Sequence, residues 1–152
     1  MRFRIAAALA LTAATSLHAQ TVTTDFNTAT PLPGTWVWAR TPDGSEATFV
    51  DAYSHPQLWV RCTRSTRTVT IARPASAAAP TLDVWTSAQT RKLPASFDPA
   101  TARLSAHLTA FDRLLDALAT SRGRIAVAVA GATPLVAPAW ADVARVVEDC
   151  RV

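Results

Sequence analysis

Apolar and polar residues alternate strictly in the middle of the chain. In residues 58–63 every second side chain is apolar, and Cys62 is the last of this set. After a polar turn, residues 68–72 alternate again, with Val69 and Ile71 on one face. Because successive side chains of a strand point to opposite faces, this pattern predicts a β-hairpin with Cys62 on its apolar side.

Further strands are predicted where the alternation recurs. A Pro-Asp-Gly turn at residues 42–44 joins two strands, the first of which carries Trp36 and Trp38 on one face. Residues 87–102 mix polar side chains with two prolines, which predicts mostly loop. The remaining predicted strands are residues 82–86, 103–108, 125–129 and 135–137.

The first stretch with helical periodicity follows these strands. Thr109 and Asp112 fit the Ser/Thr-x-x-acid signal of a helix start, and Gly123 is placed to end the helix in the left-handed conformation. One apolar stripe is predicted along it, comprising Phe111, Leu114, Leu115 and Leu118.

A second predicted helix ends the chain, starting after Pro138. Val143, Val147 and Cys150 lie at helical spacing on one face, and the charged residues fall on the opposite face. Cys150 is therefore expected to be buried. Together the elements predict one α+β domain, an antiparallel sheet of about six or seven strands with two helices.

The N-terminal region predicts export. A short basic region, an apolar run and a small-residue exit ending at Ala19 form the pattern of a secretory signal peptide, assigned to residues 1–19. Residues 20–34 are rich in threonine and are expected to be a flexible leader to the domain at residues 35–152. The mature protein is expected in the periplasm or outside the cell, with no stable membrane insertion.

The two cysteines of an exported chain predict one disulfide, Cys62 to Cys150, which tethers the last helix to the hairpin. A metal or redox site is not expected, because no C-x-x-C is present and His55 and His107 are far apart in sequence. No cofactor is implied.

Composition and motifs argue against two classes of function. Without Arg2 and Arg4 the chain has 13 basic and 11 acidic residues, a net charge of +2, so no nucleic-acid partner is expected. No catalytic residue is assigned, because Ser54 and His55 are adjacent on an extended chain and no nucleophile motif is present. The protein is therefore expected not to be an enzyme.

Two contact sites are predicted. Arg122 and Arg124 flank a turn and would bind an anion or an acidic partner, or instead complement the dipole of the preceding helix. Trp59 and Trp85 have the opposite parity to the inward residues of their strands. They would offer an exposed aromatic contact to a peptide or glycan, unless a second layer buries that face.

Two sequence features carry a resemblance to known proteins. SRGR at residues 121–124, followed by PAWADVARVVEDCR at residues 138–151, resembles a group of small secreted bacterial proteins of uncharacterised family. More widely, a strand ending in Arg-Cys, a Leu-Leu helix, a Val-rich strand and a final helix ending in Cys resemble the periplasmic type VI secretion-associated VasI/TagO family. The resemblance implies a non-catalytic role that rests on binding.

The expected function is that of a non-catalytic periplasmic binding or accessory protein, whose partner is an unknown protein or envelope component. The alternative is an inhibitor of an envelope hydrolase that acts through a protruding loop such as residues 87–99. The third alternative, a hydrolytic enzyme, would require a pocket that joins His55 or His107 to an acid and a serine.

Overall fold

The larger of two antiparallel sheets holds six strands, in the order β1-β2-β3-β4-β8-β7. The structure is a computed structural model that describes residues 25–152, so the signal peptide assigned to residues 1–19 lies outside the described residues. The strands of this sheet are β1 (Gly34–Thr41), β2 (Gly44–Asp51), β3 (Pro56–Thr63), β4 (Thr68–Pro74), β7 (Ser96–Asp98) and β8 (Arg103–Thr109).

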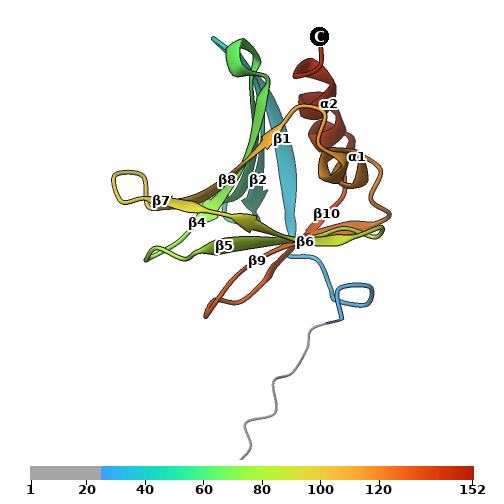
Figure 1. Cartoon of the computed structure of the whole chain (residues 1–152). Helices are drawn as coiled ribbons and strands as arrows, with labels where there is room; N and C mark the ends of the chain where they lie inside the picture. The colour runs from blue at the N-terminus through green and yellow to red at the C-terminus, as the bar shows by residue number, and fades with distance from the viewer. Residues whose placement is uncertain (1–24) are drawn as a thin grey trace, which may run out of the picture.

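The smaller sheet holds four strands in the order β10-β9-β5-β6 and lies across one end of the larger sheet (Figure 1). The guanidinium of Arg73, at the end of β4, joins the two sheets by donating to the carbonyl of Val127 at 2.7 Å. The strands are β5 (Thr81–Trp85), β6 (Thr90–Pro94), β9 (Arg124–Val129) and β10 (Leu135–Pro138).

Both α-helices lie on the same side of the larger sheet, as Figure 1 shows. Helix α2 (Ala141–Asp149) packs on strands β1, β2 and β3, and helix α1 (Arg113–Ala119) packs on α2. A short 3-10 helix, η1 (Arg64–Thr66), turns the chain between β3 and β4. The apolar faces of the sheets and helices share one core, in which Phe49, Leu58 and Leu114 are fully buried.

The predicted α+β class, the antiparallel pairing and the tethered C-terminal helix are confirmed. The hairpin of β3 and β4 has the predicted faces, since Val60 and Ile71 are both 1% exposed and Cys62 is fully buried. The predicted stripe of α2 is also buried, at Val143 and Val147. The described residues contain ten strands in two sheets, a division that the alternation pattern does not reveal.

Half of the segment predicted as mostly loop at residues 87–102 is paired in strands instead. Strand β6 pairs with β5, and β7 pairs with β8. Only one residue of β6, Leu93, is buried, so alternation within this edge strand is too weak to mark it. Pairing with β5, which is apolar at alternate positions, fixes β6 in place.

The start of α1 also differs from the prediction. Asp112 is the N-cap, and its side chain accepts a hydrogen bond from the backbone N–H of Leu114 at 2.8 Å. Thr109 ends β8, and Phe111 precedes the helix and is 62% exposed instead of joining the buried stripe. Gly123 has the expected left-handed backbone (φ 76°), but it serves the turn into β9, three residues after the C-cap.

Residues 25–34, the described part of the segment predicted as a flexible leader, contact the rest of the chain at several points. The ring of Phe26 packs at 5.7 Å from that of Trp85, and the backbone N–H of Leu32 donates to the carbonyl of Val136 at 2.8 Å. The guanidinium of Arg124 donates to the carbonyl of Ala29. This segment therefore covers part of the smaller sheet. Its sequence has no apolar periodicity, and a few individual contacts hold it there instead.

Candidate functional site

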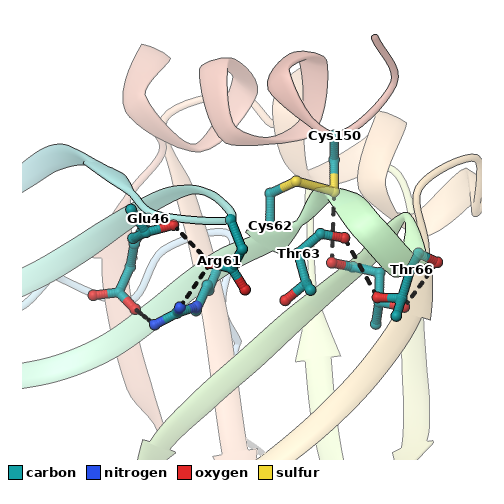
Figure 2. Close-up of polar contacts among 9 residues, drawn as sticks. Glu46, Arg61, Cys62, Thr63, Thr66 and Cys150 are labelled. Atoms are coloured by element: carbon teal, nitrogen blue, oxygen red, sulfur yellow. Dashed lines mark hydrogen bonds and ion pairs between the residues drawn. A yellow bond between two sulfur atoms is a disulfide. The ribbon is translucent and has the colours of Figure 1, made fainter.

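The disulfide between Cys62 and Cys150 determines which face of the larger sheet is covered. The two Cα atoms are 5.4 Å apart across a sequence separation of 88, and both residues are fully buried. Figure 2 shows Cys62 reaching from the sheet to Cys150 at the end of the last helix. The predicted pairing is confirmed, and it anchors α2 to the inner face of the larger sheet.

The opposite side of this sheet, called here the outer face, carries mainly polar side chains. Two rows of directly opposed residues cross the strands from β2 to β8. The first row is Glu46, Arg61, Thr70 and His107, and the second is Thr48, Trp59, Ala72 and Ser105. Because both α-helices pack on the other side, this face is open to a partner (Figure 1).

A hollow of about 220 Å³ lies on the outer face where the turn between β7 and β8 stands beside the sheet. Its floor includes the buried residues Trp59 and Ala72. Its complete lining, which defines the hollow below, is Glu46, Trp59, Arg61, Thr70, Ala72, Asp98, Thr101, Arg103 and Ser105.

Trp59 lies on the outer face, as its parity predicts, but it is not exposed. Only 8% of the residue is accessible, because the guanidinium carbon of Arg103 lies 3.6 Å from the centre of its ring. This is a cation–π contact at stacking distance. Trp59 is therefore buried instead of exposed, and the group that covers it is Arg103, which no sequence motif marks.

Most other charges of the hollow already have partners. Arg61 donates to Asp43 at 2.9 Å and lies 3.8 Å from Glu46, which also accepts a hydrogen bond from Thr48 (Figure 2 shows the Arg61–Glu46 contact). The hydrogen bond from Arg61 lowers the pKa of Asp43 below its ordinary value. The side chains of Arg61 and Glu46 are consequently held in position by contacts within the protein.

Asp98 is held within its own turn. Its carboxylate accepts hydrogen bonds from the Thr101 hydroxyl at 2.7 Å and from the backbone N–H of Ala100 at 2.9 Å. These two bonds, the one from Thr101 first, lower the pKa of Asp98. The carboxylate is a fixed acceptor at the edge of the hollow.

Of the two arginines predicted as an anion or partner contact, Arg124 has a side-chain partner within the chain. The guanidinium of Arg124 donates a hydrogen bond to the carbonyl of Ala29, and the backbone N–H of Arg122 donates to the Ser87 hydroxyl at 2.9 Å. The Ser121 hydroxyl closes the turn by donating to the Arg124 carbonyl at 2.7 Å. The SRGR motif thus joins the β5–β6 turn to the start of β9.

Trp85 lies on the outer side of the smaller sheet and is half-buried. The Phe26 ring covers it from the segment before β1. The second-layer alternative therefore describes Trp85 better than an open aromatic platform.

The two histidines of the described residues are both exposed. His55 Nδ1 lies 3.6 Å from an oxygen of Asp51 in the β2–β3 loop, and His107 Nδ1 is 3.0 Å from the hydroxyl of Thr70. Within residues 25–152, no group of three or more His, Cys, Asp or Glu side chains is arranged to hold a metal ion. The same part of the chain contains no helix long and apolar enough to cross a membrane.

Comparisons of the chain with protein-family models, with curated proteins and with solved structures each gave no match.

Proposed function

We propose that the protein is a non-catalytic binding or accessory protein of the bacterial envelope and that it binds its partner with the outer face of the larger sheet. The observation that carries this proposal is the hollow, a depression in which charged side chains surround Trp59, on a face that neither α-helix covers. Convergent polar groups around an aromatic floor are typical of binding sites.

The rigidity of this face supports the proposal. Arg61, Thr70 and Ser105 project from strands β3, β4 and β8, which are paired side by side. The backbone of paired strands loses little further freedom when a ligand binds, and this reduces the entropic cost of association. The face is thus suited to hold a ligand without a conformational change.

An envelope location is supported by the disulfide. Structural disulfides persist in oxidising compartments such as the periplasm and are rare in the cytosol. The bond between Cys62 and Cys150 agrees with the signal peptide expected from the sequence. We therefore propose that the partner is an envelope component, either a protein or a glycan.

The test is a matched pair of substitutions. Ser105→Arg places a long charged side chain in the hollow, and Ser76→Arg makes the same change at an exposed position outside it. Each purified variant is titrated against isolated envelope material, and thermal unfolding confirms that both are folded. We expect Ser105→Arg to weaken binding at least tenfold and Ser76→Arg to leave it unchanged. Equal binding by both variants would refute the proposal.

A second candidate function, inhibition of an envelope hydrolase, requires a different loop from the one first considered, because much of residues 87–99 is paired in sheets. The β2–β3 loop fits better: Tyr53 is 82% exposed, and Asp51 accepts hydrogen bonds from the backbone N–H groups of Tyr53 and His55. Loss of envelope binding in Tyr53→Ala, with Ser105→Arg unaffected, would favour this function.

A further inference from the structure

Arg103 lines the hollow, and the N–H groups of its guanidinium donate no hydrogen bond to the described residues. Among residues 25–152, its side chain has no hydrogen bond and no ion pair, in contrast to Arg61. Asp98 is directly opposite Arg103 in the β7–β8 pair, yet its carboxylate accepts from Ala100 and Thr101 instead. The charge of Arg103 contributes to the lowered pKa of Asp98, but the two side chains form no ion pair or hydrogen bond.

Stacking on Trp59 prepares Arg103 for a ligand. A guanidinium that lies on an indole ring makes contact through its flat face, so its N–H groups remain available around its edge. Those N–H groups match the two oxygens of a carboxylate, which Arg binds with two parallel hydrogen bonds. The contact with Trp59 thus restrains the Arg103 side chain before a ligand binds.

The other side chains that line the hollow favour some classes of carboxylate ligand over others. The hollow carries two acids, Glu46 and Asp98, against two arginines, so a single phosphate group, with up to two negative charges, would meet more repulsion than a single carboxylate. The acids accept hydrogen bonds from hydroxyl groups, and Ser105, two residues from Arg103 on the same face of β8, can donate or accept one.

We propose that the hollow binds a sugar unit that carries a carboxylate, such as a uronic acid of an envelope glycan. This inference rests on the proposed function, since it names the ligand class of the same face. The carboxylate pairs with Arg103, and the sugar hydroxyls bond with Glu46, Asp98 and Ser105. The binding is non-covalent, and no group is transferred.

The experiment uses trigalacturonate and its methyl ester as probes. The two share every ring and hydroxyl group, and only the acid carries carboxylates. The exported protein, with its disulfide intact, is titrated with each by calorimetry, and the indole N–H of Trp59 is followed by NMR. We expect the acid to bind about ten- to a hundredfold more tightly than the ester, the range for a hydrogen-bonded charged group.

Two substitutions identify the group responsible. Arg103→Lys keeps the charge but loses the planar fork, so we expect it to weaken binding of the acid about tenfold or more. Arg40→Lys makes the same change at an exposed position outside the hollow, and we expect no effect. Thermal unfolding of both variants confirms the fold.

Equal affinity for acid and ester, or an unaffected Arg103→Lys, would overturn the inference. Tighter binding of acetyl-trialanine than of trigalacturonate, with acetyl-trialanine amide inactive, would overturn the sugar class in favour of a peptide carboxylate. If neither uronate probe binds while Ser105→Arg still weakens envelope binding, the inference fails and the proposed function stands. If Ser105→Arg leaves envelope binding unchanged, the proposed function fails.

Discussion

Removal of the disulfide is expected to be among the most destabilising changes that leave the rest of the core intact. The change is the double substitution Cys62→Ala with Cys150→Ala. The bond closes a loop across a sequence separation of 88, and both cysteines are fully buried between α2 and the larger sheet. Without the disulfide, the unfolded chain has more conformational entropy, and α2 is held in the folded state by packing alone.

The magnitude follows from the loop length. For a loop of this size the chain-entropy relation gives about 4.5 kcal/mol. Marginal domains have a total stability of about 5–15 kcal/mol, so this loss is a large part of the whole. With a urea dependence of about 2 kcal/mol per molar, the unfolding midpoint should fall by about 2 M.

The assay is equilibrium unfolding in urea, followed by tryptophan fluorescence. The wild type is measured with and without a reductant, and the double variant serves as the control because reductant cannot change it further. We expect the reduced wild type and the double variant to unfold at similar urea concentrations, well below the oxidised protein. A midpoint shift below about 0.5 M would show that packing holds α2 and that the bond is dispensable.

Three further substitutions test the local contacts. Asp112→Ala removes a helix cap and the ion pair with Arg91, at a cost of about 1–2 kcal/mol near neutral pH. The hydrogen bond from Arg91 lowers the pKa of Asp112 in the folded state. The stabilisation from the Asp112 carboxylate is therefore present above about pH 4 and is lost as the pH falls through the pKa of the folded state. Urea unfolding between about pH 6 and pH 2 measures this loss. Gly44→Ala would place a Cβ atom 2.4 Å from the Cys62 carbonyl oxygen and should cost about 1–3 kcal/mol in the same assay. Arg124→Ala should speed amide exchange in the segment before β1 and leave the global unfolding midpoint nearly unchanged.

Each of these expectations has a contradicting outcome. A stability difference for Asp112→Ala that is constant across the acid range would exclude its carboxylate as the source. Wild-type stability in Gly44→Ala would mean that the β1–β2 turn adjusts freely. Unchanged exchange in Arg124→Ala would show that other contacts hold the segment.

The local sequence pattern was sufficient to predict a strand or helix where that element has an apolar face of its own. The alternation of β3 and β4 and the helical spacing of α2 each placed a cysteine toward the core, and the confirmed disulfide follows from their agreement. Strand β6 could not be recognised in this way, because a single buried residue, Leu93, provides no period. Its conformation is determined by its partner β5.

The candidate site shows the same limit. Parity placed Trp59 on the outer face, but its burial depends on Arg103, a residue 44 positions later that arrives on β8. No local signal links the two, since the cation–π contact exists only after β3, β4 and β8 have paired. Phe111 has the spacing of the apolar stripe but is not buried with it. Asp112 caps the helix, so Phe111 lies before its first turn.

The most direct test of the account is a hydroxyl-radical footprint of the protein with and without envelope material. Val37 and His107 are exposed on the outer face, whereas Tyr53 lies in the β2–β3 loop and Phe111 before α1. If the outer face is the binding surface, oxidation of Val37 and His107 will fall on binding and that of Tyr53 and Phe111 will not change. Protection of Tyr53 or Phe111, with Val37 and His107 still oxidised, would contradict it.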